Sequence, residues 1–447
     1  MPALLISTYD LGRQPFGLAS AAAVLRAAGV DVTCLDLAKQ RLDLEAVGHS
    51  DAIAFFLPMH TATRLALPVI DRVRAANPDA QLIAYGLYAP LNEALLLERG
   101  VRHVIGGEFE DDLVRAVTGG GSSEDGSGAR RELPRVHFLV PDRQGLPGLS
   151  RYATVQIGSE RRVAGYTEAS RGCKHRCRHC PIVPVYDGRF RIVPIPIVLE
   201  DIRRQVEDGA RHITFGDPDF LNGPRHAREL VTSLAGEFPG LTYDVTIKIE
   251  HLAAHPGLLP VLRDTDCLFV TSAVESIDDR VLAHLEKGHT RRDFEEVVAR
   301  CRAVGLTLVP TFVAFTPWTT LAGYCELLAA IESLGLIEHV PPVQLMIRLL
   351  IPEGSRLLEL EDIRGVIGRY SPTSLTYPWM HRDPAVDALQ RSIEGIVGRQ
   401  LVADRQTVFG QIWDAAFAAA ELTPRLRREP PRLSRAAIPY LNEPWYC

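Results

Sequence analysis

The 447-residue chain has no apolar run that approaches the roughly eighteen residues of a membrane-spanning helix. Its first residues, 1–5, lack the basic start of a secretory signal peptide. An excess of positive charge is also missing, because the net charge is -6, whereas proteins that bind nucleic acids usually present a basic face. These absences predict a cytoplasmic protein without a membrane or nucleic-acid partner.

Cysteine is scarce, and most of its eight copies are scattered. Four of them lie in apolar surroundings, where a thiol packs as a small hydrophobic group. These four are Cys34, Cys267, Cys301 and Cys325. Three others form one group, Cys173-x-x-x-Cys177-x-x-Cys180, and no fourth cysteine lies close by to complete a tetrad.

Two kinds of metal centre suit three thiols at this spacing. Iron-sulfur clusters are normally held by four thiolates, so a 4Fe-4S cluster on three would leave one iron open to a small chelating molecule. Structural zinc needs four ligands, and His175 or His179 could supply the fourth. A disulfide is disfavoured because the chain shows no secretory signal.

The first part of the chain, residues 1–118, alternates short apolar runs with helical patterns. Strands are expected at 3–7, 30–35, 52–57, 81–85 and 101–105, and helices at 18–28, 61–76 and from about 109. This order predicts a doubly wound parallel α/β sheet covered on both faces. Such sheets bind ligands at the carboxyl ends of their strands, where His60 could face the crevice or simply lie at the surface.

Residues 119–150 are interpreted as a flexible linker, because 119–128 is a low-complexity run without apolar residues. Residues 151–355 then repeat a strand-helix pattern six times. The strands are expected at 163–170, 212–215, 243–249, 268–274, 306–315 and 343–350. Six units predict a parallel barrel, or part of one, with its functional loops at the carboxyl ends of the strands. Residues 356–447 are expected to form a mainly helical extension.

The cysteine spacing resembles the cluster motif of the radical S-adenosylmethionine superfamily, whose fold is an incomplete six-unit barrel. The resemblance implies a 4Fe-4S cluster on Cys173, Cys177 and Cys180, with the methionine end of S-adenosylmethionine on the open iron. It also implies an enzyme that cleaves this cofactor reductively to a 5'-deoxyadenosyl radical. The expected partners are a small or peptidic substrate and an electron donor such as flavodoxin or ferredoxin.

Polar residues at the predicted strand ends resemble the cofactor-binding segments of the same family. The residues that the resemblance assigns to cofactor binding are Gly216, Asp217, Asp219, Lys248, Glu250, Ser272, Glu275 and Arg348. Gly216 would allow close backbone approach, and Asp217 or Asp219 would accept from the cofactor's ammonium; a simple turn is the alternative for that segment. Arg348 would be costly to bury unpaired, so it is expected to meet a carboxylate, either the cofactor's or that of Glu275.

Two residues downstream have a simpler explanation. Thr290 followed by Asp293 is more economically a helix N-cap than a catalytic pair. Trp318, after the fifth expected strand, could line the adenine or substrate site or belong to the core.

The N-terminal part, with Gly106-Gly107-Glu108-Phe109-Glu110 before its last helix, resembles the cobalamin-binding domain of many radical S-adenosylmethionine enzymes. Domains that ligate cobalt from below carry Asp-x-His-x-x-Gly after the first strand, and the corresponding loop here, residues 8–17, has no histidine. Several cobalamin-dependent members lack that ligand, so cobalamin stays a candidate cofactor.

The last ten residues, 438–447, are rich in aromatic residues and end on Cys447. Together with 171–181, 215–220, 248–251 and 348–355, they resemble the radical proteins with a CUAEP or CCAEP tail. In those proteins the cysteine is followed by cysteine or selenocysteine and then Ala-Glu-Pro, so this chain would be a truncated selenoprotein or its cysteine counterpart. The resemblance implies that Cys447 returns to the barrel mouth to bind substrate or relay electrons; a frayed terminus is the alternative.

The leading hypothesis is a radical S-adenosylmethionine enzyme with an unidentified substrate. A cobalamin-dependent radical methyltransferase is the first alternative, and a zinc-stabilised, non-catalytic binding protein is the second. An RNA-modifying methylthiotransferase is disfavoured, because the chain is acidic and carries no basic appended domain.

Overall fold

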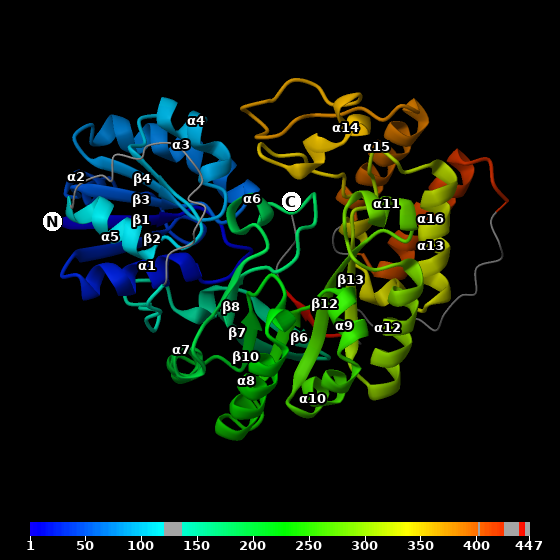
Figure 1. Cartoon of the computed structure of the whole chain (residues 1–447), viewed down its shortest axis with the longest axis horizontal. Helices are drawn as coiled ribbons and strands as arrows, with labels where there is room; N and C mark the ends of the chain where they lie inside the picture. The colour runs from blue at the N-terminus through cyan, green and yellow to red at the C-terminus, as the bar shows by residue number, and fades with distance from the viewer. Residues whose placement is uncertain (120–135, 401–402, 424–437, 443–447) are drawn as a thin grey trace.

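The computed structural model describes residues 1–119, 136–400, 403–423 and 438–442. Figure 1 shows three parts: an N-terminal parallel sheet with its helices, a larger curved sheet, and a C-terminal group of helices. The fold class predicted from the sequence is confirmed. Within the described part of the chain, no helix is both long enough and apolar enough to cross a bilayer.

The N-terminal sheet has five parallel strands in the order β2-β1-β3-β4-β5. The strands are β1 (Pro2–Ser7), β2 (Asp31–Asp36), β3 (Ala52–Phe56), β4 (Gln81–Tyr85) and β5 (His103–Ile105). The helices are α1 (Phe16–Ala27), α2 (Leu44–Gly48), α3 (His60–Ala76), α4 (Glu93–Glu98) and α5 (Glu110–Thr118). One core forms on the face of α1 and α5 and another on the face of α2, α3 and α4, as expected for a doubly wound sheet.

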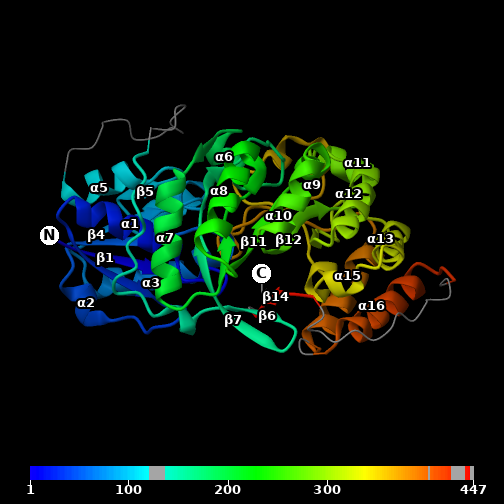
Figure 2. The ribbon, with the colours of Figure 1, turned by 90° about the horizontal axis from the view of Figure 1, so that it is seen from below.

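The second sheet has seven strands in the order β13-β12-β11-β10-β7-β6-β14. The strands are β6 (Thr154–Ile157), β7 (Glu160–Thr167), β10 (His212–Phe215), β11 (Thr242–Thr246), β12 (Cys267–Glu275), β13 (Thr307–Phe312) and β14 (Tyr440–Leu441). The five strands from β7 to β13 are parallel, whereas β6 is antiparallel to both of its neighbours. The sheet curls into the predicted partial barrel, and its carboxyl ends point to a common edge (Figure 2).

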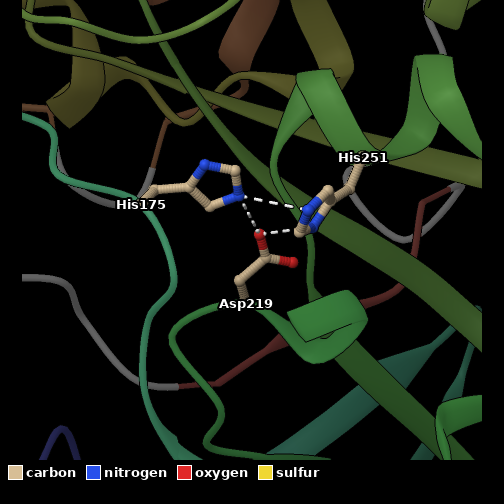
Figure 3. A group of neighbouring side chains, drawn as sticks. All are labelled: His175, Asp219 and His251. Carbon is tan, nitrogen blue, oxygen red and sulfur yellow. Dashed lines mark hydrogen bonds and ion pairs between the residues drawn. The ribbon is translucent and has the colours of Figure 1, made fainter. Parts of the chain in front are cut away.

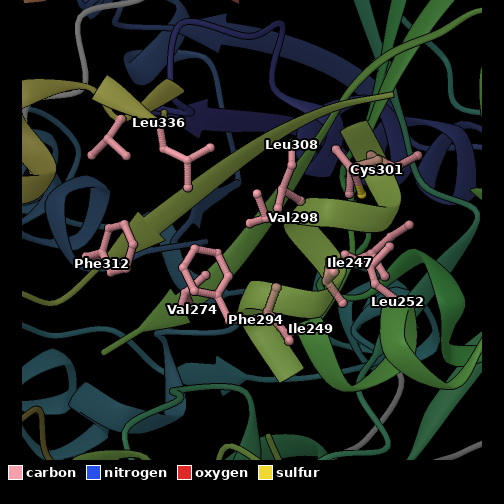
Figure 4. Packing of buried hydrophobic residues seen from close by; sticks show 14 of the residues in the cluster. Ile247, Ile249, Leu252, Val274, Phe294, Val298, Cys301, Leu308, Phe312 and Leu336 are labelled. Carbon is pink, nitrogen blue, oxygen red and sulfur yellow. The ribbon is translucent and has the colours of Figure 1, made fainter. Parts of the chain in front are cut away.

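Helices connect the parallel strands and cover the outside of the curved sheet. They are α7 (Ile195–Glu207), α8 (Pro224–Glu237), α9 (Ile249–Ala254), α10 (Leu259–Asp264), α11 (Asp279–His284), α12 (Arg291–Val304) and α13 (Leu321–Ser333). Thr290 and Asp293 form a capping box at the start of α12, which confirms the N-cap interpretation. Figure 4 shows how Phe294 and Val298 of α12 pack with Phe312 and Leu308 of β13 in the main apolar core.

The prediction of a sixth strand at residues 343–350 is wrong, because this segment does not form a regular strand. A 3-10 turn, η6 (Pro342–Leu345), occupies its start, and only one parallel bridge, Phe315 to Arg348, joins the segment to its neighbour. Pro341 and Pro342 precede the run, and proline cannot donate to a sheet ladder. The sixth unit therefore closes the barrel edge with a single contact.

Part of the predicted linker is packed against both sheets. Arg143 donates to Asp201 of α7 (2.9 Å), to Gln14 (2.8 Å) and to the carbonyl of Tyr166 (2.8 Å). The Gly-rich stretch before it, residues 120–135, lies outside the described residues. Residues 136–150 thus join the N-terminal sheet to the barrel through defined hydrogen bonds.

The C-terminal extension contains α14 (Glu361–Arg364), α15 (Pro384–Gly398) and α16 (Arg405–Ala419). A hairpin-like segment, residues 367–379, follows α14 and is held by the bridges Ile367 to Trp379 and Ser371 to Thr376. Its tip reaches back to the N-terminal domain (Figure 1), where Leu375 is buried in the core beside α3 and α4. We call residues 367–379 the docking hairpin.

Candidate active site

The three grouped cysteines lie in a loop at the carboxyl edge of the barrel. The loop follows β8 (Ser170–Gly172), which pairs with β9 (Phe190–Ile192) beside the end of β7. Cys173 and Cys177 are buried and Cys180 is partly buried. The amide of Cys180 donates to the carbonyl of Cys177 at 3.2 Å, so a tight turn separates these two cysteines. Cys177 and Cys173 are also close enough to Cys180 to act on its thiol electrostatically.

Burial favours the protonated form of the Cys173 and Cys180 thiols. It raises the pKa of Cys173 to about 11 and that of Cys180 to about 12. A metal centre stabilises the thiolate and displaces the proton. The three cysteines of this loop are the ligand type that holds iron-sulfur clusters.

Neighbouring elements fix the loop on both sides. Asn222, after β10, accepts from the amide of Lys174 and donates to the carbonyl of Gly172, both at 3.1 Å. The amide of Arg178 donates to the carbonyl of Leu285 after α11 at 3.0 Å. Gly172 has a φ of 73°, and a Cβ there would lie 2.4 Å from the Tyr186 ring, so glycine is required at that turn.

Arg171 ties the same loop to the N-terminal domain. Its guanidinium donates to Ser20 of α1 at 3.0 Å, pairs with Glu168 at 2.8 Å and contacts Glu110 of α5. These groups are buried or largely buried, and Arg171 also stacks near the ring of Phe109. The cluster loop is thus positioned by both domains.

The loop after β10 carries Gly216 and Asp217. A Cβ on Gly216 would lie 1.7 Å from the Tyr166 hydroxyl oxygen, so the packing of Tyr166 by itself requires glycine here. Asp217 is buried and accepts from Ser170 Oγ at 2.6 Å and from the amide of Ala169 at 2.9 Å. Burial raises the pKa of Asp217 to about 7, and its two hydrogen bonds hold the start of β8.

Asp219, from the same loop, lies in a group with two imidazoles (Figure 3). Its Oδ2 is 2.7 Å from Nδ1 of His251 and 3.5 Å from Nε2 of His175. The Nε2 atoms of the two histidines are 3.1 Å apart. Burial alone would raise the pKa of Asp219, but the two imidazoles lower it to about 2, so the carboxylate is ionised.

Lys248 and Glu250 follow β11 and form an ion pair at 3.0 Å. Glu250 Oε2 also lies 3.3 Å from Nδ1 of His175. Glycine at position 288 makes this arrangement possible, because a Cβ there would lie 2.3 Å from Glu250 Oε2. The segment after β11 is thereby linked to the cysteine loop through His175.

Glu275 ends β12 and has a φ of 68°, a left-handed backbone that is unfavourable for a residue with a side chain. Its Oε1 lies 3.1 Å from Nε2 of His179 and 3.3 Å from Nζ of Lys287. Burial opposes ionisation, but Lys287 and then His179 bring the pKa of Glu275 to about 2. Ser272, on the same strand, donates to the carbonyl of Ile247 at 2.6 Å.

Arg348 does not pair with Glu275, so that part of the prediction is wrong. Its guanidinium donates to Asp387 of α15 and to the carbonyl of Trp379, both at 2.7 Å, and stacks 3.6 Å from the Trp379 ring centroid. Glu275 already has two cationic partners, and Arg348 points to the C-terminal extension. Its observed contacts attach that extension to the barrel.

Three predicted cofactor residues, Asp219, Glu250 and Glu275, lie beside His175 or His179 of the cysteine loop. Arg348 lies against the C-terminal extension instead. Lys287 was not among the predicted site residues, and His179 was predicted only as a possible zinc ligand, yet both contact Glu275. The Lys-Gly pair at 287–288 could have pointed to Lys287 as a site residue. The sequence position of Lys287 did not indicate that it would pair with Glu275. Trp318 stacks on His284 at 4.5 Å and donates to Asp362. Cys447 lies outside the described residues.

Aromatic side chains pack on one face of the N-terminal sheet. Phe56, Tyr85 and Phe109 lie in the core on the face of α1 and α5, with ring centroids 5.4 and 4.9 Å apart. On the face of α3 and α4, the carbonyl of Ser374 in the docking hairpin lies 2.6 Å from Nε2 of His60. His60 is therefore held by the docking hairpin.

Comparison with known proteins supports the barrel assignment. Residues 167–319 match the family model described as the Radical SAM superfamily. This match supports the predicted radical S-adenosylmethionine domain over residues 167–319.

The curated relatives include a tRNA-2-methylthio-N(6)-dimethylallyladenosine synthase from Chlorobium phaeovibrioides, which is 28% identical over 180 residues. That match covers 36% of this chain and 38% of the relative. The ribosomal protein uS12 methylthiotransferase RimO from Porphyromonas gingivalis is 28% identical over 181 residues, covering 38% and 41%. The chain thus spans about two fifths of the length of these relatives.

Two solved structures share the fold at low sequence identity. The cobalamin-dependent S-adenosylmethionine radical enzyme OxsB with aqua-cobalamin bound superposes with a TM-score of 0.72 at 15% identity, covering 94% of this chain and 71% of that one. The radical S-adenosylmethionine methyltransferase TsrM from Kitasatospora setae gives 0.58 at 18%, covering 75% and 71%. The likeness to OxsB extends over both sheets.

Proposed function

We propose that the chain is a radical S-adenosylmethionine enzyme with its cluster on Cys173, Cys177 and Cys180. The observation that carries this proposal is the anchored loop with three thiols, at the carboxyl edge of a curved parallel sheet. A 4Fe-4S cluster bound there supplies the electron that cleaves the sulfonium of S-adenosylmethionine to 5'-deoxyadenosyl radical and methionine.

The chain's own residues prepare the site for a zwitterionic cofactor. Asp219 and Glu275 are ionised carboxylates, and each is shared with cationic or imidazole partners. Lys248 and Glu250 present a cation and a partly exposed carboxylate beside the cluster loop. We assign the amino-acid end of the cofactor to this side, because opposite charges there can pair with both its ammonium and its carboxylate.

Ser272 and Asp217 act as positioning residues in this proposal. Both side chains are buried. Ser272 donates to the carbonyl of Ile247, and Asp217 accepts from Ser170 Oγ and from the amide of Ala169. They fix the ends of β12 and β8 relative to the loop, so they hold the site without touching the cofactor. Gly216 serves the packing of Tyr166 in the same way.

Anaerobic reconstitution tests this function. The chain is expected to bind iron and sulfide, to show broad iron-sulfur absorbance, and to release 5'-deoxyadenosine when it is reduced with S-adenosylmethionine. Replacing Cys180 by Ala should abolish all three, whereas Cys325→Ala, in α13 of the core, should retain them. A clean zinc stoichiometry without iron would support the zinc-stabilised binding protein instead.

We also place the chain among the proteins with a CUAEP or CCAEP tail and assign Cys447 a role at the barrel mouth. Strand β14 is antiparallel to β6, and β6 is antiparallel to β7, so β14 runs toward the edge that carries the cluster loop (Figure 2). Asn442 donates to Thr154 and Gln156 there. The five residues after it can span at most about 17 Å. Activity that is unchanged by Cys447→Ala, in a chain carrying the full tail, would refute this role.

A cobalamin-dependent radical methyltransferase is the second candidate, favoured by the likeness to OxsB over 94% of the chain. Cobalamin retained at one equivalent after gel filtration would favour this candidate. The substrate in either case is a small molecule or a peptide, and the electron donor is a flavodoxin-like or ferredoxin-like protein.

A further inference from the structure

Three potential metal ligands from separate elements meet beside the cluster loop. His175 belongs to that loop, Asp219 follows β10, and His251 lies in the first turn of α9 after β11. One donor atom from each lies within 4.8 Å of the other two. Their side chains are 12%, 0% and 3% exposed, so the group is shielded from bulk water.

The distances within the group suit ligands of one ion. Zinc binds imidazole nitrogen and carboxylate oxygen at about 2.0–2.2 Å, which places two ligand atoms of a tetrahedral site roughly 3.3 Å apart. Asp219 Oδ2 lies 2.7 Å from Nδ1 of His251 and 3.5 Å from Nε2 of His175. These two separations fall on either side of that value, so small side-chain rotations would complete the site.

Two of the donor atoms are buried but do not hydrogen-bond. Asp219 Oδ2 and His251 Nδ1 have no hydrogen-bond partner despite their separation of 2.7 Å. The two atoms contact each other as an ion pair that lacks hydrogen-bond geometry (Figure 3). An ion that both atoms face would give each of them a ligand bond in place of that contact.

The outer contacts are those expected around metal ligands. A metal-bound imidazole usually donates its second N–H to a carboxylate, and Nδ1 of His175 lies 3.3 Å from Oε2 of Glu250. Glu250 is held in turn by Lys248. The other oxygen of Asp219, Oδ1, accepts from the amide of Leu221 at 3.1 Å, which fixes the carboxylate and leaves Oδ2 for the ion.

We propose that His175, Asp219 and His251 bind a divalent transition-metal ion, with zinc as the reference ion, separately from the cluster. Two imidazoles and one carboxylate form a ligand set that zinc and ferrous iron share. Three protein ligands leave at least one position open, and that position takes an oxygen ligand such as the carboxylate of a bound amino acid. The ion would also join the cluster loop to the ends of β10 and β11.

This site shares Asp219 with the side that the proposed function assigns to the cofactor's amino-acid end, and it rests on that proposal for the ligand at its open position. None of its ligands is a cysteine, so its metal content can be measured separately from the cluster. The test uses anaerobically reconstituted holoenzyme that is incubated with zinc and then desalted. Iron, sulfide and zinc are measured together, and X-ray absorption at the zinc edge identifies the ligand atoms. We expect one zinc per chain with a shell of nitrogen and oxygen at about 2.0 Å, while the iron and sulfide contents stay unchanged.

Variants separate this site from adventitious zinc. Asp219→Asn and His251→Gln should each lower zinc affinity at least tenfold. Glu250→Gln, which alters only the outer contact of His175, should lower it by about 10–100-fold. His255→Gln is the matched control, because that ring lies 6.0 Å from His251 outside the group, and it should retain zinc.

Three results would overturn the proposal. They are no retained zinc in the holoenzyme, a sulfur shell at about 2.3 Å, and equal zinc affinity in Glu250→Gln and the unaltered chain. Loss of the cluster alone, with zinc retained on nitrogen and oxygen ligands, would contradict the proposed function but support this site. The iron content and the far-ultraviolet circular dichroism of each variant show whether it has folded.

Discussion

The Nε2 atom of His179 lies 3.1 Å from Oε1 of Glu275, which joins the cysteine loop to the end of β12. Lys287 completes the contact at 3.3 Å. The residue immediately before Cys180 is therefore held by a carboxylate that lies 96 positions further along the chain. Because all three side chains are largely buried, the loop geometry depends on this group.

Replacing Glu275 by Gln should destabilise the protein by about 3 kcal/mol, because it leaves the charge of Lys287 buried without a counter-ion. The pKa of Glu275 is about 2 in the folded chain, below its ordinary value. The contribution of the ionised Glu275 to the free energy of unfolding is therefore full at neutral pH, and it is lost as the pH falls toward 2. Thermal unfolding of the cluster-free protein at several pH values measures the difference.

The matched control for this prediction is Glu229→Gln, which removes an exposed ion pair with Arg225. Exposed pairs contribute little, so its midpoint should hardly change. A Glu275→Gln midpoint that equals the control at neutral pH would contradict the assigned role of the carboxylate.

Asp217→Asn should stabilise the chain above neutral pH. Burial raises the pKa of Asp217 to about 7, so the folded state favours the protonated carboxyl. The contribution of this carboxyl group to the free energy of unfolding is full below 3.8, the ordinary pKa of Asp in the unfolded chain. That contribution is lost as the pH rises through about 7. An amide stays neutral and can still bond Ser170 and the Ala169 amide. At about pH 8 the variant should be more stable by on the order of a few kcal/mol; equal or lower stability in urea unfolding would contradict the account.

Arg348→Lys should loosen the C-terminal extension and leave the cofactor site intact. Lysine cannot reproduce both hydrogen bonds to Asp387 and Trp379 or the stacking on the indole ring. We expect a loss of about 1–3 kcal/mol with unchanged iron content and unchanged affinity for S-adenosylmethionine. A tenfold loss of cofactor affinity at full iron content would restore the cofactor role that the sequence suggested.

Leu375→Ala should release the docking hairpin from the N-terminal domain. The side chain is 1% exposed, and a buried leucine truncated to alanine costs about 2–5 kcal/mol. Limited proteolysis should then cut within residues 367–379 more rapidly. Met380→Ala, at a side chain that is 76% exposed, is the control. Equal cleavage of both variants would show that Leu375 does not hold the hairpin.

The N-terminal strands could be predicted within one or two residues, since buried parallel strands are nearly continuous apolar runs. The run from Val343 to Leu350 looks the same in sequence. However, the prolines before it and the 3-10 turn at its start leave only the bridge at Arg348. Hydrophobicity alone does not reveal whether an apolar segment forms backbone hydrogen bonds with a neighbouring strand.

The candidate site could be predicted as a set of strand ends but not as a set of contacts. Asp219, Glu250 and Glu275 were assigned to the site by the resemblance of these predicted strand ends to the cofactor-binding segments of the radical S-adenosylmethionine family. Their partners depend on loop conformations that bring distant residues together, as when Lys287 rather than Arg348 reaches Glu275. The sequence therefore indicated the chemistry of the barrel edge, whereas the ion pairs required the structure.

The most direct test of the central claim is the yield of 5'-deoxyadenosine from S-adenosylmethionine after anaerobic reconstitution and chemical reduction. The unaltered chain should release it in proportion to its iron content, and Cys177→Ala should release none. An iron-free chain that binds zinc stoichiometrically and leaves S-adenosylmethionine intact would contradict the claim.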